Sequence, residues 1–302
     1  MTTPLRTWHK RALQANVVAQ AGIVVTGAIV RVTSSGLGCP TWPECVAGSI
    51  TPTSTQTEAW HKYIEFGNRM LTTVLVIVAI ACIAATRQHN MDRVAAGLNR
   101  RPLLLKLALA CFGGIFAQAI LGGITVLTGL NPLTVAAHFL VSIGLIAMAL
   151  ILLWRAQEST DLRELNISPI AHRGIQTLLG LALIVIVIGT LVTGTGPHAG
   201  DTAEITRLPF DPRVISWIHA DVVLLFMGLL IGLLVTLYAL NASHSVKRAG
   251  IITLVVALGQ GTVGYVQYFT SLPWVLVAFH VAGACLLWIT TLRFLLSTKS
   301  AT

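Results

Sequence analysis

Long apolar runs dominate this chain, and polar stretches separate them at intervals. Eight runs of about 20 residues stand out, near residues 13–33, 63–86, 104–126, 134–154, 174–194, 214–240, 249–270 and 274–296. A run of roughly 20 apolar residues is the length that crosses the hydrocarbon of a bilayer as one helix. The pattern therefore predicts an all-α integral membrane protein with eight transmembrane helices.

Composition and charge fit this pattern. Of 302 residues, 55% are hydrophobic and 10% are charged, whereas charged residues make up about a quarter of a typical soluble domain. Most lysines and arginines lie at the termini and in alternate loops, which predicts that both termini are cytoplasmic. The net charge of +9 is then a topology signal, and its scatter over short loops argues against nucleic-acid binding. The expected surroundings are the lipid bilayer of a cell membrane.

The two halves of the chain repeat one pattern. The segment QAILGGITVLTGLNPLTVAAHF (118–139) overlays on QGTVGYVQYFTSLPWVLVAFHV (260–281). Four spans return a chain to the side where it started, so residues 1–155 and 156–302 are predicted to form two repeated four-helix bundles in the same orientation. The overlay places four residues at one depth, on the second, fourth, sixth and eighth spans: Asn68, His138, His219 and His280.

Three of these four positions are histidines inside predicted spans. A single intramembrane histidine can simply bond to a neighbouring helix, but ionisable groups in a membrane usually face a cavity or a partner. Two histidines on facing helices at one depth suit a planar heme with axial imidazoles. Zinc needs more compact ligands, and the intramembrane cysteines lie at scattered depths, as small core residues do: Cys82, Cys111 and Cys285.

The loop after the first span contains GCPTWPEC (38–45). Its Cys39 and Cys45 are the two cysteines predicted outside the membrane, where an oxidising exterior permits a disulfide. Such a bridge either shapes the loop or passes electrons by thiol exchange. The next span opens with Glu65 and Arg69, one turn apart, which are either an ion pair or part of a reaction site.

These motifs together resemble the heme A synthase family. The resemblance rests on SGLGCPTWPEC after the first span, IEFGNR on the second, HF on the fourth and FH on the eighth, and it extends along the whole chain. It implies an oxidoreductase that converts a ring methyl of heme O to a formyl group by successive hydroxylations. It further implies oxygen taken from water, an external electron carrier, a heme O synthase that supplies the substrate, and a bacterial plasma membrane.

The resemblance also implies roles for individual residues. In the C-terminal unit, His219 and His280 would hold a heme b that relays electrons. In the N-terminal unit, which takes the substrate heme, Glu65 would be the catalytic carboxylate and His138 an iron ligand. Arg69 belongs to the same heme-binding motif. Arg31 lies near the outer surface, where it either pairs with a heme propionate or extends to the membrane interface.

The chain departs from the family pattern at Asn68, where a histidine is common. An amide oxygen is a weak iron donor compared with imidazole. Three interpretations follow: Asn68 lines the substrate face and leaves the sixth iron position open, His61 substitutes as the ligand from two turns further out, or the N-terminal half has lost catalysis. A different class of protein, a diheme b-type electron carrier without heme modification, would need a strong ligand opposite His138.

The remaining histidines fall mostly on the cytoplasmic side, away from the predicted site. His9, His89, His172 and His244 are expected to be surface residues. His198 lies in an outer loop and is expected to be solvated or to contact a propionate.

Overall fold

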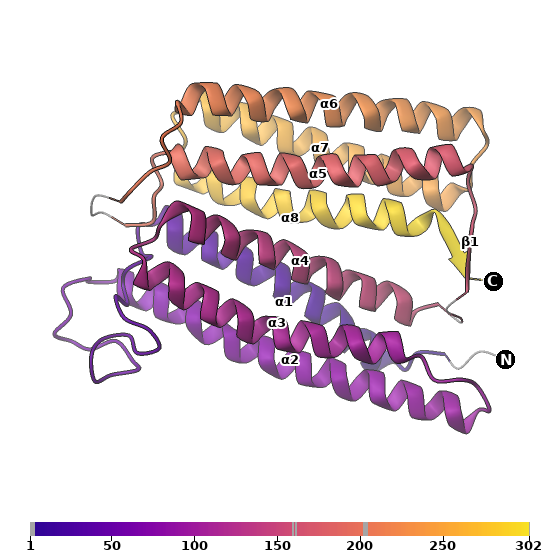
Figure 1. Cartoon of the computed structure of the whole chain (residues 1–302), viewed down its shortest axis with the longest axis horizontal. Helices are drawn as coiled ribbons and strands as arrows, with labels where there is room; N and C mark the ends of the chain where they lie inside the picture. The colour runs from indigo at the N-terminus through magenta and orange to yellow at the C-terminus, as the bar shows by residue number, and fades with distance from the viewer. Residues whose placement is uncertain (1–3, 159, 161, 202–204, 302) are drawn as a thin grey trace.

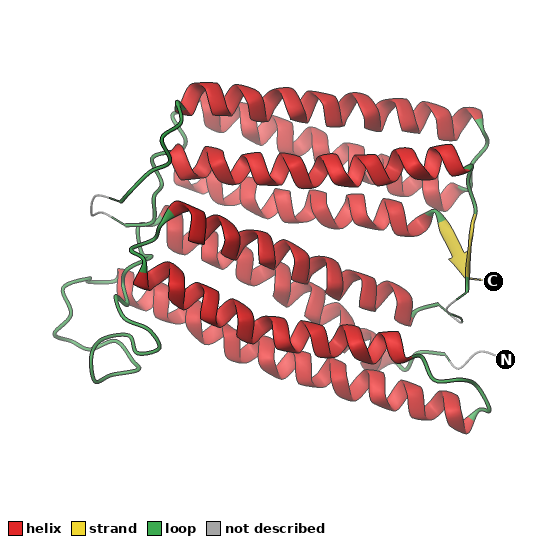
Figure 2. Cartoon of the chain, in the orientation of Figure 1, coloured by secondary structure: helices red, strands yellow, loops and turns green. Residues whose placement is uncertain are grey.

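The computed structural model describes residues 4–158, 160, 162–201 and 205–301. Within these residues it contains eight helices that are long and apolar enough to cross a membrane. Two short strands and the connecting loops make up the rest of the described residues (Figure 2). The helices are α1 (Thr7–Val32), α2 (His61–Ala95), α3 (Pro102–Leu127), α4 (Pro132–Ala156), α5 (Pro169–Thr195), α6 (Pro212–Ala239), α7 (His244–Phe269) and α8 (Trp274–Ser297). The strands β1 (Arg163–Leu165) and β2 (Lys299–Ala301) pair antiparallel.

Each predicted span corresponds to one of these helices, which confirms the all-helical membrane class. The largest difference is at α2, which continues to Ala95 through the polar sequence RQHNMDRVA (87–95). No glycine or proline interrupts this segment before Gly97. Gly97 has a φ of 73°, the left-handed conformation that ends helices and that glycine adopts at little cost.

Capping residues set the starts of several helices. α4, α5 and α6 each begin with a proline, whose missing N–H would have had no partner in the first turn. The residue before each proline has a side chain that accepts hydrogen bonds from first-turn N–H groups: Asn131, Ser168 and Asp211. Such caps fix where each span enters the membrane.

The helices fall into two groups (Figure 1). In α1–α4 each helix packs on the next and α4 returns to α1, and α5–α8 pack in the same way. As a result α2 lies diagonally across from α4, and α6 across from α8. The groups meet along α1, α4, α5 and α8, where the Trp288 indole N–H of α8 donates to the Ile143 carbonyl of α4 at 3.0 Å.

The two ends of the molecule differ in character. Both termini and the β1–β2 pair lie at one end, and the long loops after α1 and α5 lie at the other (Figure 1). We call the second of these the outer end, following the sequence prediction. The side of the membrane that each end faces stays a prediction.

Three histidines expected at the surface are buried instead, and that expectation was wrong. His9, His89 and His172 expose only 0%, 3% and 9% of their surface, whereas His244 is exposed as expected. His89 lies on the part of α2 beyond its predicted end, so these extra turns cover the start of α1. His172 is held by Thr298, whose Oγ1 lies 2.7 Å from its Nδ1.

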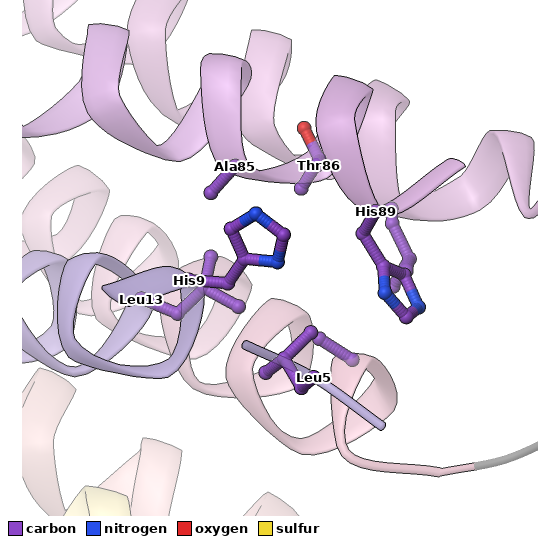
Figure 3. A pocket seen from close by; sticks show the side chains of 8 residues that line it. Leu5, His9, Leu13, Ala85, Thr86 and His89 are labelled. Atoms are coloured by element: carbon purple, nitrogen blue, oxygen red, sulfur yellow. The ribbon is translucent and has the colours of Figure 1, made fainter. Parts of the chain in front are cut away.

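A small pocket separates the first turns of α1 from the end of α2 (Figure 3). His9 and His89 face each other there with ring centroids 6.3 Å apart, and Leu13 and Thr86 line the same space. The pocket lies at the end of the molecule away from the outer loops.

Candidate functional site

The carboxylate of Glu65 lies at the outer end of α2, beneath the cysteine loop. It is 5% exposed. Its Oε1 accepts from Arg69 Nη2 at 2.6 Å and from Arg69 Nε at 3.1 Å. Its Oε2 accepts from the backbone N–H of Cys39 at 2.6 Å. Both oxygens therefore have fixed donors, and the carboxylate is held in one orientation.

Arg69 ties the same loop to α2. Its Nη2 donates to the Cys39 carbonyl at 2.7 Å, and its Nη1 donates to the carbonyls of Thr41 and Glu44 at 3.0 and 3.2 Å. Because the guanidinium is a planar fork of five donors, it can bond the loop and Glu65 together. Arg69 is thus placed to position both the loop and the carboxylate.

The loop is closed by the predicted disulfide between Cys39 and Cys45, which is confirmed. Both cysteines are fully buried. Lys62 fastens the following stretch, because its Nζ donates to the Thr53 carbonyl at 2.8 Å and the Gln56 carbonyl at 3.4 Å. The cluster of Lys62, Glu65 and Arg69 over about two turns at the start of α2 thus serves to anchor this loop.

Trp42 extends from the loop onto α3. A Cβ built on Gly123 would overlap the indole of Trp42, so only glycine permits this close contact. The neighbouring Gly122 faces the imidazole of His138, with a built Cβ 3.2 Å from its Cε1. In the repeat overlay Gly123 falls at Tyr265, so the N-terminal group has made room for Trp42 beside the histidine.

The three predicted histidines share one environment. Each imidazole packs against a glycine of the preceding helix: His138 against Gly122, His219 against Gly189 and His280 against Gly264. A Cβ built on each glycine would lie 3.2–3.3 Å from the Cε1 atom of the histidine. In the two matching helix pairs a glutamine also donates to the histidine carbonyl at 2.9 Å: Gln118 to His138 and Gln260 to His280. Helix α3 therefore holds α4 as α7 holds α8.

His219 and His280 face each other across the α5–α8 group. Their ring centroids are 6.5 Å apart and their planes make an angle of 68°. Imidazole nitrogens bind metal ions at about 2 Å, so the space between the two rings can hold one metal ion bound by both. The Nδ1 atom of His280 is buried without a hydrogen-bond partner among the described residues. The pair fits the axial ligation of a heme.

The N-terminal group departs from this arrangement at Asn68. The Oδ1 of Asn68 accepts from Thr26 Oγ1 at 2.7 Å. Gly27, which overlays on Gly189, has no atom within 4 Å of a built Cβ. The side chain of Asn68 is shorter than an imidazole and does not contact Gly27 as the His219 ring of α6 contacts Gly189. Its oxygen already accepts a hydrogen bond from Thr26.

His61 lies seven residues before Asn68 and turns toward the outer loop. Its Nδ1 is 2.9 Å from Ser35 Oγ, and its ring stacks on Trp60 with centroids 4.0 Å apart. The structure thus places His61 with the loops, about 10 Å outward of Asn68 by helix rise. This position favours the interpretation in which the side of the site opposite His138 is open.

Arg31 joins the two helix groups at the outer end. Its Nε donates to the His198 carbonyl at 2.8 Å and its Nη2 to the Thr193 carbonyl at 2.9 Å. The Nε2 of His198 in turn lies 2.8 Å from the Leu272 carbonyl oxygen. A propionate contact for Arg31 stays a prediction. Its observed bonds link α1 to the last turn of α5 and to the segment after it.

Several contacts of the site were not predicted from the sequence. Thr26 and Gly123 carry no motif that marks a site, since threonine and glycine are frequent in membrane helices, and the motif that contains Trp42 does not show that its indole packs on α3. Gln118 and Gln260 had a signal, because the repeat overlay aligned them twenty residues before His138 and His280. A donor preserved in both halves at one spacing indicates a shared role.

Comparisons with known proteins agree with the resemblance seen in the motifs. The COX15-CtaA family model, described as cytochrome oxidase assembly protein, matches residues 10–292. A heme A synthase of Geobacillus kaustophilus is 30% identical over 141 residues, which cover 45% of this chain and 40% of that relative. A heme A synthase of Bacillus mycoides is 22% identical over 295 residues, covering 92% of this chain and 89% of the relative.

Proposed function

Because the chain belongs to the COX15-CtaA family of cytochrome oxidase assembly proteins, we propose that it is a heme A synthase of the cell membrane. It would convert heme O to heme A by oxidising a ring methyl to a formyl group. The long matches to heme A synthases support this activity. The observation that carries it is the buried Glu65 fixed by Arg69 and Cys39 beneath the disulfide loop.

The two helix groups would have different tasks, as repeats that have diverged. Residues 156–302 would hold a heme b between His219 and His280, which supplies reversible electron transfer when bound. The 6.5 Å separation of the two rings supports this assignment. Residues 1–155 would take the substrate heme O between α2 and α4.

In the N-terminal group His138 would bind the substrate iron from α4. Asn68 would line the opposite face without binding the metal, since Thr26 already donates to its oxygen and an amide oxygen is a weak donor to iron. The substrate would then have one strong protein ligand and one accessible face. Such a site suits oxidation, whereas two imidazoles suit electron transfer.

Glu65 would act as the base of the reaction. In each hydroxylation a methyl C–H bond breaks, a C–O bond to a water oxygen forms, two electrons pass to the external carrier and two protons are released. After the second hydroxylation the carbon bears two hydroxyls and loses water to give the formyl group. Glu65 would accept a proton from the attacking water at Oε1 or Oε2. Arg69 and the Cys39 N–H would hold the carboxylate in place during this transfer.

Arg69 would keep the carboxylate aimed during this transfer. Because it bonds both Glu65 and three loop carbonyls, the loop and the base move as one unit. The loop would also exclude bulk water from the outer side of the site, with Trp42 seated on Gly123.

The substrate would come from another protein, and the electrons would leave to one. Heme O would reach the site from a heme O synthase in the same bilayer. The oxidation releases electrons, so an external acceptor must take them; a heme b held by His219 and His280 would supply the electron transfer to it.

The proposal is tested by expressing the full chain with a heme O synthase, extracting the pigments and separating them by chromatography with mass detection. Heme A or its hydroxylated precursor is expected from the wild type. Glu65→Gln should abolish both products while the C-terminal heme is retained, and Glu164→Gln, on exposed β1, serves as the control. Unaltered heme O from a folded, heme-loaded wild type would reject the synthase and favour an electron carrier.

A further inference from the structure

Three carboxylates lie within the eight described helices, and one of them has no partner. Glu65 is bonded to Arg69 and Cys39. Asp92, at the inner end of α2, is bonded to Arg6 and Gln88. No hydrogen bond or ion pair to the Asp221 side chain of α6 occurs among residues 4–158, 160, 162–201 and 205–301, and Asp221 is exposed. An unpaired carboxylate in a membrane helix needs an explanation.

Asp221 points away from its own helix group. The buried residues of α6 include Phe226, Leu230 and Leu237, which lie on the same side as His219 at helical spacing. At about 100° per residue, Asp221 is turned about 200° from His219. It therefore faces outward, toward lipid or another protein, and not toward α8.

The position of Asp221 along α6 lies inside the hydrocarbon. Arg213 sits over the ring of Trp217 at 4.9 Å, and tryptophans of this kind mark the membrane interface. Asp221 lies four residues further in, about 6 Å by helix rise. The short aspartate side chain cannot carry its charge back to the interface as a lysine or arginine does.

The same outward face of α6 permits close approach of a second helix. Gly228 and Gly232 are exposed, and no atom lies within 4 Å of a Cβ built on either. They are four residues apart, the spacing at which small residues let two membrane helices touch along their backbones. Leu224 and Val235 flank them at 61% and 65% exposure.

We propose that this surface, made of Asp221, Leu224, Gly228, Gly232 and Val235 and called here the Asp221 face, binds a transmembrane helix of another protein that carries a lysine or arginine at the depth of Asp221. The cation would pair with the carboxylate, and the glycines would bring the two backbones together. The charge selects the partner, because a neutral helix would leave the carboxylate unpaired in hydrocarbon.

A second copy of this chain fits the Asp221 face poorly. A symmetric contact would bring two Asp221 carboxylates together. The cations of the described helices at similar depth are also engaged, since Arg31 bonds the Thr193 and His198 carbonyls and Arg69 bonds Glu65. The partner that matches is therefore a different, cationic helix.

The test measures energy transfer in liposomes between the labelled full chain and two synthetic single-span helices. Both have a leucine and alanine sequence, and one carries a lysine at the depth of Asp221 where the other has leucine. The lysine helix should associate about tenfold more tightly with the wild type, as a membrane polar contact of 1–2 kcal/mol implies. Asp221→Asn should reduce this preference to about onefold.

Substitution of the glycines tests the close packing of the Asp221 face separately from the charge of Asp221. Gly228→Leu should weaken binding of the lysine helix although Asp221 is retained, whereas Gly113→Leu on α3, another glycine with no atom within 4 Å, should not. Equal binding of the two synthetic helices would overturn the proposal. Association between copies of the chain that is lost in Asp221→Asn would also overturn it, in favour of a homo-oligomer. Neither outcome depends on heme oxidation.

Discussion

The oxygen of Asn68 accepts a hydrogen bond from Thr26, and this contact determines what the side chain can offer a substrate heme. In α6 the same position is His219, whose ring occupies the space beside Gly189. At the matching Gly27 of α1, no side chain comes within 4 Å of a Cβ built on the glycine. In the proposed function, this one residue would distinguish a relay site with two imidazoles from a reaction site with one.

Asn68→His is expected to convert the reaction site toward a second relay. The new imidazole has room beside Gly27 and would face His138, so the accessible face of the substrate would be lost. Carbon monoxide should bind about half of the heme in the reduced wild type and almost none in the variant. Asn68→Ala removes the amide without adding a ligand, and carbon monoxide binding equal to that of Asn68→His would contradict the account.

Arg69→Lys is expected to lower heme A formation about 10- to 100-fold, because an ammonium cannot bond Glu65 and three loop carbonyls in the same plane. The C-terminal heme should keep its optical spectrum. Arg6→Lys is the matched control, since Arg6 makes an exposed bond to Asp92 at the other end of the molecule. Product yields that fall equally in both variants would argue against a positioning role for Arg69.

At the scale of elements, the disulfide loop and helix α3 meet through Trp42 and Gly123. The loop is fastened to α2 by Arg69 and Lys62 and to α3 by this close contact. It thus bridges the outer ends of two helices of the N-terminal group, directly above Glu65.

Gly123→Ala should displace Trp42, because the added methyl overlaps the indole. Overpacking of this kind costs about 1–3 kcal/mol, and the loop should detach before the helices unfold. Hydrogen exchange of residues 37–46 is expected to be faster than in the wild type. Gly113→Ala lies on the same helix with no atom within 4 Å, and faster exchange in both variants would remove the special role of the contact.

The elements were largely predictable from the sequence, because hydrophobic length alone defines a membrane span. All eight helices were found this way, and the spacing of Gln118, His138, Gln260 and His280 indicated which helices match. The limits appear where polar residues are covered by other parts of the chain. The polar end of α2 carried no span signal, so the burial of His9 was missed. The small β1–β2 pair, which joins the segment before α5 to the end of the chain, was missed as well.

The site was predictable in its parts and not in its connections. Glu65, Arg69 and the cysteine pair carry recognisable motifs, and the disulfide was expected. The Cys39 N–H bond to Glu65 and the seat of Trp42 on Gly123 depend on how the loop folds back over α2 and α3. Such long-range contacts leave no periodic pattern in a single sequence.

At the scale of the whole molecule, the two helix groups are joined along their length. Trp288 bonds Ile143 in the membrane, Arg31 bonds the segment after α5, and the Gly36 N–H donates to the Gly200 carbonyl at 2.7 Å at the outer end. The two helix groups are therefore held together both by packing within the membrane and by contacts of the outer loops.

His219→Ala should separate the two tasks. It removes one axial ligand of the proposed relay and leaves Glu65, His138 and the loop in place. The low-spin signal of heme b is expected to disappear, and heme A formation should fall about 100-fold because electrons can no longer leave the reaction site efficiently. His244→Ala, at an exposed position, should change neither quantity, and unchanged heme spectra in His219→Ala would refute the relay assignment.

The most direct test of the whole account is electron paramagnetic resonance of the purified oxidised full chain loaded with heme b and heme O. The account predicts two signals of equal intensity: a low-spin heme with two imidazole ligands, from His219 and His280, and a high-spin heme with one, from His138. Two low-spin signals of the bis-imidazole type would contradict it, because the N-terminal group would then be a second relay and not a reaction site.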